Sequence, residues 1–177
     1  VDQLLLKDEA ANLQYGAIQA FVYAFTFIGG IFADKILGFK KSLLFGGTVM
    51  ILGNLLIAFS PSTMFYYGIA FSIIGTGFFK PNISSMVGDL YAEGDPRRDA
   101  GFGLFYSGIN IGALLGGAIC VYLGTSHDYG WNYAFLAAAV VMTIGLITFA
   151  FIRKSLGPIG NSPLLELPKT KRTTQEI

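Results

Sequence analysis

Long apolar blocks alternate with short polar stretches along this chain. The blocks are Leu13–Phe32, Ser42–Phe59, Met64 to about Tyr91, Gly101–Leu123 and Trp131–Phe151. Each is close to the ~20 residues that a helix needs to cross a hydrocarbon core of ~30 Å. Strands of a membrane barrel would be about half as long and would alternate in polarity. The pattern therefore predicts five transmembrane helices.

Composition agrees with this interpretation. Hydrophobic residues make up 53% of the sequence and charged residues 13%, and the mean hydropathy is +0.58. The first block has no basic leader and no small-residue cleavage site, and four further blocks follow it, so we do not interpret it as a signal peptide. The predicted fold class is an all-α membrane protein.

The polar stretches predict the orientation of the helices. Basic residues follow the first, third and fifth blocks: Lys35, Lys40, Lys41, Arg97, Arg98, Arg153, Lys154, Lys169, Lys171 and Arg172. Because Lys and Arg accumulate in cytoplasmic loops, these blocks should end in the cytoplasm. Val1 would then start outside the cell, which favours a missing preceding helix and a chain that is a fragment. We expect an external segment over 1–12, a helical part over 13–151 and a truncated cytoplasmic linker over 152–177.

The chain offers little for metal, redox or nucleic-acid chemistry. One cysteine, Cys120, and one histidine, His127, allow neither a disulfide nor a metal motif. His127 falls in the predicted external loop, where we expect an exposed residue. The net charge of +1 is explained by the loop bias. We predict no metal, no organic cofactor and no nucleic-acid partner, and the lipid bilayer as the surroundings.

Lys80 lies inside the third apolar block. A Lys there costs about 3 kcal/mol on insertion scales, so it normally marks a solute or proton path. No acid lies at the same depth elsewhere in the chain. This combination predicts a transporter whose ion-pair partner for Lys80 lies outside these residues.

Glycines mark one face of the fourth block. Gly108, Gly112 and Gly116 recur at every fourth position, and small residues on one face allow close contact between helices. The stripe favours a compact bundle and indicates no particular function. Without an opposing bundle, we expect this face or its neighbours to lack a partner.

The polar stretch before the fourth block reads as a helix start. Asp95 is placed to cap the helix, and Pro96 fits its first turn. A cytoplasmic gate at these charges is the functional alternative to this structural interpretation.

Three motifs connect the blocks to a known family. The loop Gly30-Ile-Phe-Ala-Asp34-Lys35-Ile-Leu-Gly38-Phe-Lys40-Lys41 resembles the G-x-x-x-D-[RK]-x-G-[RK]-[RK] loop of the major facilitator superfamily, with one residue more before the second glycine. The runs Gly75-Thr-Gly-Phe-Phe-Lys80-Pro81-Asn-Ile-Ser84 and Phe105-Tyr106-Ser-Gly108-Ile-Asn110-Ile-Gly112 resemble the paired signatures of the proton-dependent oligopeptide transporter (POT/PTR) family. Tyr23 precedes Asp34 by the family's spacing. The resemblance covers nearly all of the hydrophobic chain.

The resemblance implies roles for individual residues in a central peptide cavity. Lys80 corresponds to the lysine implicated in proton coupling and in binding the peptide carboxylate. Tyr23 and Asn110 correspond to residues that line the cavity, and Tyr106 to one that supports it. A peptide presents an ammonium, a carboxylate and an amide, so a cation and neutral hydrogen-bonding groups are suitable partners. Taken alone, Tyr23 and Asn110 would favour interhelical hydrogen bonds of about 0.6–2 kcal/mol.

The same resemblance assigns the loop after the first block to conformational change. Gly30 would permit a close approach of another segment. Asp34, at a helix end, could form ion pairs with cations or accept hydrogen bonds from helix N-terminal amides, and these contacts would re-form as the protein changes state. Lys35 belongs to the same gating motif.

Two family features are not found in the chain. The E-x-x-E-R-[FY] motif, which would supply the acids for Lys80, belongs before Val1. Gly16 stands where animal members carry a histidine, so that proton site is absent from the first block.

The predicted architecture is a partial N-terminal bundle of a major facilitator fold, covering about its second to sixth helices. The predicted function is proton-coupled symport of di- and tripeptides across the cell membrane by alternating access, with protons, peptides and the remaining helices as partners. Transport of another solute, such as nitrate or amino acids, remains open. A membrane-integral enzyme is less favoured because the blocks hold no nucleophile–base pair and no metal motif. A scaffold would leave the burial of Lys80 unexplained.

Overall fold

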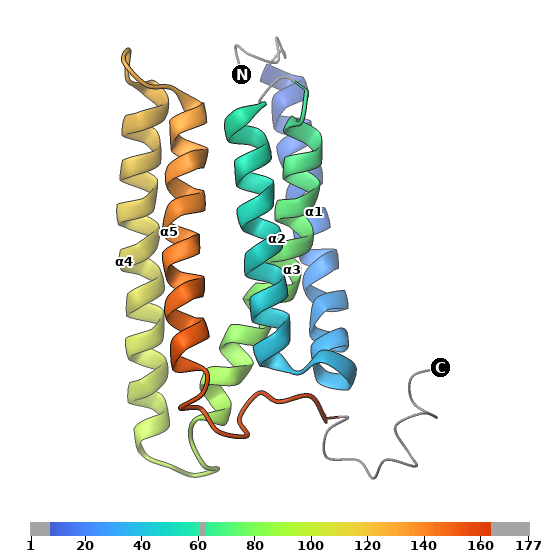
Figure 1. The fold of residues 1–177 in the computed structure, drawn as a ribbon, viewed down its shortest axis with the longest axis vertical. Coiled ribbons are helices and arrows are strands. Elements are labelled where there is room, and N and C mark those ends of the chain that lie inside the picture. Colours follow the sequence, from blue (N-terminus) through green and yellow to red (C-terminus); the bar gives the residue numbers. More distant parts are fainter. Residues whose placement is uncertain (1–7, 61–62, 164–177) are drawn as a thin grey trace.

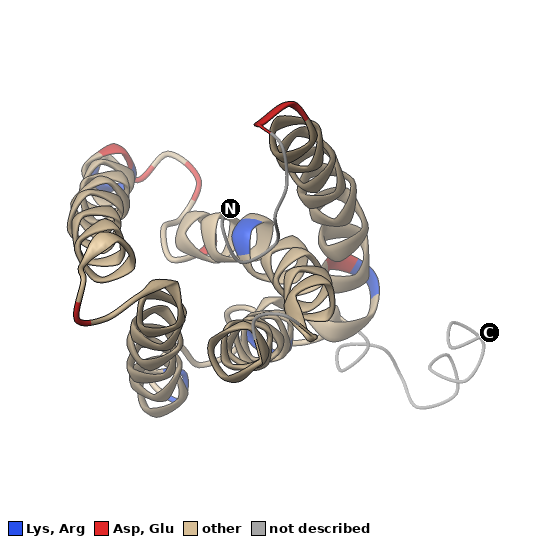
Figure 2. Cartoon of the chain, turned by 90° about the horizontal axis from the view of Figure 1, so that it is seen from above, with Lys and Arg blue, Asp and Glu red and all other residues tan. Residues whose placement is uncertain are grey.

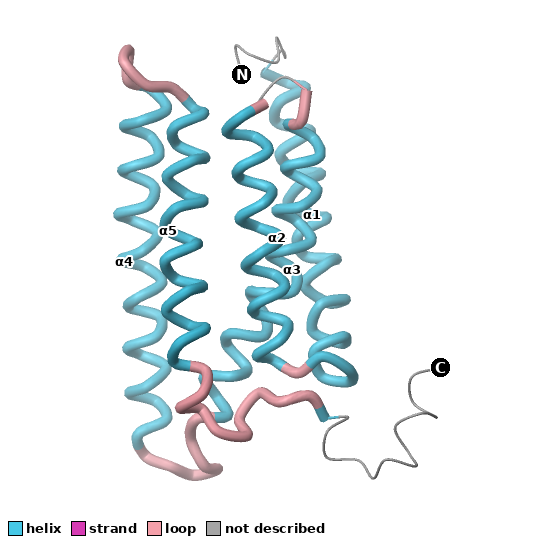
Figure 3. Tube along the Cα trace, in the orientation of Figure 1, coloured by secondary structure: helices cyan, strands magenta, loops and turns pink. Residues whose placement is uncertain are grey.

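The computed structural model describes residues 8–60 and 63–163. These residues form the α-helices α1 (Asp8–Phe32), α2 (Phe39–Phe59), α3 (Phe65–Asp89), α4 (Arg97–Thr125) and α5 (Trp131–Ile152), with a short π-helix, η1 (Ala33–Leu37), between α1 and α2. The rest of the described chain is loop and turn, without strands (Figure 3). Each predicted block coincides with one helix, so the predicted all-α fold is confirmed.

The helices run up and down the long axis of the molecule (Figure 1). The most extensive packing is between α2 and α3. In addition, α3 packs on α1, and α2 packs on α5. The remaining helix, α4, packs mainly on α5. Viewed from above, the α4–α5 pair stands beside the group formed by α1, α2 and α3 (Figure 2). No residue of α4 is buried.

Among the described helices, α1, α2, α4 and α5 are long and apolar enough to cross a membrane, and α3 is not apolar enough. At 25 residues α3 is long enough to span the bilayer. Its second half carries Lys80, Pro81 and Asn82, which lower its hydropathy. The helix packed between α1 and α2 is thus the one whose membrane-length stretch is least apolar.

Facing glycines build the contacts within the α1–α2–α3 group. A Cβ atom on Gly46 would lie 2.6 Å from the carbonyl oxygen of Gly75, and one on Gly53 would lie 2.6 Å from that of Gly68. A Cβ on Gly29 would overlap the carbonyl of Gly77. Only hydrogen fits at such positions, so the helix backbones lie directly against each other.

The predicted stripe on α4 is not part of this packing. A Cβ on Gly108, Gly112 or Gly116 would meet no atom within 4 Å. Within the described chain this face has no partner, as expected for a bundle without its opposing half.

The start of α4 is capped as predicted. The carboxylate of Asp95 accepts a hydrogen bond from the backbone N–H of Arg97 at 2.9 Å and pairs with its guanidinium at 2.8 Å. The hydrogen bond from the Arg97 side chain, followed by that from its backbone, lowers the pKa of Asp95 from its ordinary value of 3.8. Pro96, which was predicted in the first turn, is instead the N-cap residue directly before the first helical residue.

After α5 the chain turns back to the start of α2. The backbone N–H of Lys40 donates to the carbonyl of Gly160 at 2.9 Å, and the Ser162 hydroxyl donates to the carbonyl of Ile36. Of the predicted linker, residues 164–177 lie outside the described residues, as do residues 1–7 of the predicted external segment.

Candidate functional site

The structure brings Lys80 of α3 and Tyr23 of α1 together. The Lys80 ammonium lies 5.8 Å from the centroid of the Tyr23 ring, within the range of a cation–π interaction. Both residues are exposed, Tyr23 at 69%. Within residues 8–60 and 63–163 no carboxylate forms an ion pair with Lys80. An aromatic face is thus the partner of this ammonium in the described chain.

Local backbone chemistry explains why α1 and α3 meet beside this pair. Pro81 has no N–H, so it cannot donate to the carbonyl of Gly77, four residues earlier. That carbonyl lies against Gly29 of α1, where the absence of a side chain admits it. The two helices therefore make contact at a carbonyl that has no N–H donor four residues further along its own helix.

Asn82 reinforces this contact. It is 1% exposed, and its side-chain amide donates to the carbonyl of Phe78 at 2.7 Å and to that of Gly29 at 3.4 Å. The first bond stays within α3 and the second crosses to α1. Asn82 lies within the motif around Lys80, but the sequence pattern gave it no separate role.

The other two predicted cavity residues lie apart from this pair. Asn110 and Tyr106 are exposed on α4. The Tyr106 ring is stacked on the Phe102 ring at a centroid distance of 6.3 Å, and its centroid lies 5.5 Å from that of Phe105. No hydrogen bond joins either residue to Lys80 or Tyr23 in the described chain. The physical reason is that α4 packs mainly on α5. Their roles as cavity residues remain predictions.

Gly30 lies near the end of α1, and the described chain shows no close approach there, so its part in a conformational change remains a prediction. A Cβ on Gly30 would meet nothing within 4 Å, and it is the neighbouring Gly29 that touches α3. Successive helical residues point about 100° apart, so the two glycines face different surroundings.

Asp34 and Lys35 lie exposed in η1, where the N–H of Gly38 donates to the carbonyl of Ala33 at 2.9 Å. The described chain shows no hydrogen bond or ion pair of either side chain. Their gating role therefore remains a prediction.

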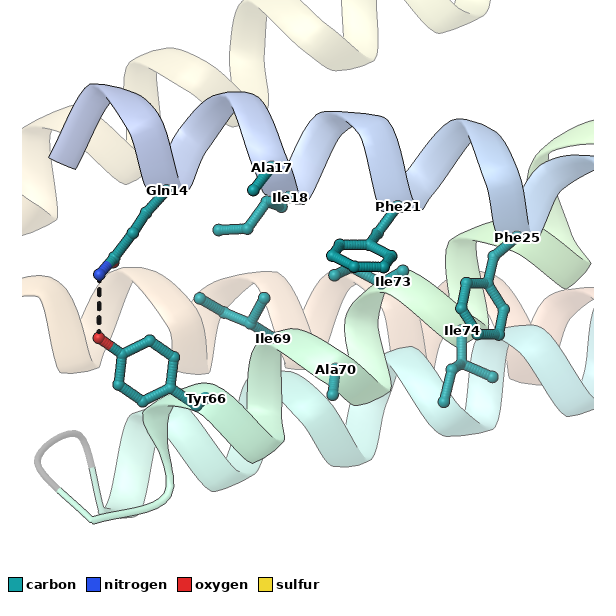
Figure 4. A pocket seen from close by; sticks show the side chains of 10 residues that line it. All are labelled: Gln14, Ala17, Ile18, Phe21, Phe25, Tyr66, Ile69, Ala70, Ile73 and Ile74. Atoms are coloured by element: carbon teal, nitrogen blue, oxygen red, sulfur yellow. Dashed lines mark hydrogen bonds between the residues drawn. The ribbon is translucent and has the colours of Figure 1, made fainter. Parts of the chain in front are cut away.

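A groove of about 390 Å³ lies between α1 and α3 (Figure 4), and Lys80 is not among the residues that line it. Its walls are almost wholly apolar, with Ile18, Phe21 and Ile69 among them. At one end, the Gln14 side chain donates to the Tyr66 hydroxyl at 3.3 Å. With no charged group on its walls, the groove suits an apolar neighbour better than a peptide.

The sequence motifs and this geometry now agree with a comparison to known proteins. The family model described as the POT family matches residues 40–163. The chain belongs to the POT family. The resemblance of the Lys80 and Asn110 motifs to this family is thereby confirmed, and its helices make the chain a multi-pass protein of the cell membrane.

Relatives in the POT family include transporters and permeases. The chain is 45% identical over 150 residues to the uncharacterized transporter YclF of Bacillus subtilis, a match that covers 84% of the chain and 30% of that relative. It is 34% identical over 174 residues to dipeptide and tripeptide permease B of Aliivibrio fischeri, with coverage of 97% and 35%. The chain thus spans about a third of the length of these relatives.

Solved POT structures share the fold. A mutant of the peptide transporter POT in complex with sulfate superposes with a TM-score of 0.86 at 35% identity, over 98% of this chain and 35% of that one. The same transporter in complex with alafosfalin gives 0.78 at 35% identity, over 90% and 33%. The predicted partial bundle of a major facilitator fold is confirmed.

Proposed function

We propose that the protein carrying this chain is a proton-coupled symporter of di- and tripeptides that works by alternating access. The observation that carries the proposal is the exposed Lys80 ammonium, held on the Tyr23 ring of a neighbouring helix without an acid partner in the described chain. A cation inside a membrane-length helix costs about 3 kcal/mol, so it is retained for a function. Membership of the POT family and the names of its permease relatives support peptides as the solute.

In this proposal, each residue of the site has a distinct task. Lys80 binds the peptide carboxylate and couples it to the proton. The Tyr23 ring holds the ammonium in place through its face, and its hydroxyl remains free for the substrate. Asn110 and Tyr106, on the open side of α4, supply neutral hydrogen-bonding groups for the peptide amide. The proton is the coupling ion, and no cofactor is required.

The loop between α1 and α2 supplies the conformational step. Asp34, with Lys35 and Gly30 beside it, is proposed to exchange contacts at the cytoplasmic end as the protein changes state. The exposure of Asp34 and Lys35 supports this, because neither is tied to another residue of the described chain.

Uptake by the full-length protein in proteoliposomes, under an imposed proton gradient, tests the proposal. Lys80→Ala and Lys80→Gln should both abolish accumulation of a labelled dipeptide, since each removes the charge. Arg98→Gln is the matched control because the Arg98 guanidinium also lies over a ring, that of Phe102, at 5.9 Å, but at the start of α4. It should retain uptake. Wild-type accumulation by the Lys80→Gln variant would show that the charge has no role.

Two further arms separate the parts of the proposal. Tyr23→Phe keeps the ring under Lys80, whereas Tyr23→Leu removes it, so the Leu variant should lose more uptake if the ring face positions the ammonium. Nitrate and free amino acids are offered in place of the dipeptide. Gradient-driven accumulation of one of these, without the dipeptide, would show that the substrate class is wrong while leaving the coupling role of Lys80 intact.

A further inference from the structure

A basic concavity lies where the start of α2, the end of α5 and the chain after α5 meet. It has a volume of about 300 Å³. Its lining is Lys40, Lys41, Arg153, Lys154, Gly157, Gly160, Asn161 and Ser162. The cations come from two segments more than a hundred residues apart in sequence, and none of the lining residues is acidic.

The concavity is held in shape by contacts within the chain. Lys40 binds the chain after α5 through both its backbone N–H and its ammonium, which donates to Asn161 Oδ1 at 3.2 Å and to the carbonyl of Gly157. A Cβ on Gly38 would overlap the backbone of Asn161, so the two segments lie in direct contact. Lys40 therefore forms part of the wall.

The other three cations are available to a ligand. Lys41, Arg153 and Lys154 are exposed, and the described chain offers them neither an ion pair nor a hydrogen bond. The start of α2 adds the positive end of its helix dipole. Three cations that have no partner in the described chain, around a cavity whose lining holds no acid, favour an anion with several acceptor oxygens.

The height of the cavity on the bundle places it at the membrane surface. Arg153 directly follows Ile152, the last residue of the apolar α5, and Lys41 precedes the apolar part of α2. The side chains of Phe151 and Ile147 on α5 are 79% and 52% exposed. A phosphate in the cavity would therefore have apolar helix surface nearby, on the side where acyl chains lie.

We propose that this cavity binds the phosphodiester headgroup of an anionic phospholipid, with the acyl chains along α5. Basic pockets between helices at the cytoplasmic interface suit such headgroups, and this end of the bundle is the one that the loop charges predict to be cytoplasmic. The inference is independent of the transported solute.

Native mass spectrometry of the full-length protein, titrated with phosphatidylglycerol or phosphatidylcholine, tests the site. The wild type should prefer phosphatidylglycerol. Arg153→Gln combined with Lys154→Gln should lower that affinity about thirtyfold, as expected when two cations near an anionic lipid are lost. Arg97→Gln combined with Arg98→Gln removes the same charge from the start of α4, outside the cavity, and should leave the affinity near the wild-type value.

The remaining outcomes decide against the proposal. Equal losses in the two double variants would show general surface charge, and no loss in the Arg153/Lys154 variant would show that the cavity does not bind the lipid. Competition by inorganic phosphate as effective as that of phosphatidylglycerol would identify a soluble anion as the ligand. Size-exclusion elution and unchanged phosphatidylcholine binding show that each variant is folded. Lys80→Gln should keep the lipid preference, so a failure of the transport proposal is recognisable separately.

Discussion

In the α1–α2–α3 group, carbonyl oxygens of one helix lie against glycines of the next, whereas Gly108, Gly112 and Gly116 of α4 face open space. Both regions have the same kind of sequence, with small residues at helical spacing. The first region uses them to bring backbones into contact. The second offers a similar face for which the described chain supplies no partner.

This difference also divides the predicted site. Lys80 and Tyr23 belong to the packed region, where Gly29, Gly77 and Asn82 fix the helices that carry them. Asn110 and Tyr106 belong to α4, whose position depends chiefly on α5. A cavity that uses all four residues therefore needs α4 to be held by more than the described contacts.

The largest effect is expected from labelling, because it is all or none. In a background with Cys120→Ala, a single Lys40→Cys substitution tests the α1–α2–α3 group, and a single Lys154→Cys substitution tests the end of the α4–α5 pair. Both should be shielded from an impermeant thiol reagent applied to intact cells, and Ser126→Cys should react, because the loop charges place Ser126 outside. Labelling at only one of the two lysine positions would mean that the regions do not share one orientation.

The packing contrast itself is tested by adding one methyl group to each region. Gly75→Ala should destabilise the chain by about 1–3 kcal/mol, since its Cβ would lie 2.6 Å from the Gly46 carbonyl oxygen. Gly112→Ala is the matched helix-interior control and should be neutral or stabilising by up to about 1 kcal/mol through helix propensity. Thermal midpoints in detergent measure both. Equal destabilisation would contradict the open face on α4.

A smaller loss is expected at Asn82. Replacing it with Ala removes the amide that crosses from α3 to α1, which should cost about 0.6–1.7 kcal/mol, the range for hydrogen bonds between membrane helices. Asn54→Ala is the control, because the Asn54 amide donates at 2.8 Å to Met50, within its own helix. The same thermal measurement should show a smaller shift for Asn54. A larger shift of the thermal midpoint for Asn54→Ala than for Asn82→Ala would show that hydrogen bonds within a helix contribute more to stability than the bond between α3 and α1.

The smallest effect concerns the cap of α4. The pKa of Asp95 is lowered in the folded chain, so its contribution to stability is complete above its ordinary value of 3.8 and is lost as the pH falls through the lowered folded value. Asp95→Asn should remove this acid-dependent part of the thermal midpoint, and Asp99→Asn in the same turn should not. A pH series between neutral and strongly acidic conditions checks the difference. Identical profiles for the wild type and Asp95→Asn would contradict the cap.

Much of the fold follows from one-dimensional pattern. Apolar blocks of bilayer length correspond to helices, and the Asp95 cap depends on neighbouring residues only, so both were predictable. The choice between Gly29 and Gly30 was not. Both are small and adjacent, and which one touches α3 depends on the rotation of α1 about its axis.

Tertiary contacts also limit what the sequence predicts at the site. The motif placed Lys80 and Tyr23 in one cavity, but the contact of the ammonium with the ring, and the second bond of Asn82, depend on how α1 and α3 cross. Likewise, the loop charges put Lys41 and Arg153 on one side of the membrane. Their convergence on one cavity follows from the chain after α5 folding onto the start of α2.

The modest apolarity of α3 has a consequence for how the protein is made. Because α3 carries Lys80, Pro81 and Asn82 in its second half, its transfer from the translocon into lipid is less favourable in free energy than that of the neighbouring helices. It therefore has a weaker tendency to enter the membrane unaided. Its two packing partners, α1 and α2, precede it in the chain and are synthesised first. The glycine faces that receive α3 are therefore already available when it emerges, and its insertion should be completed by helix contact more than by lipid.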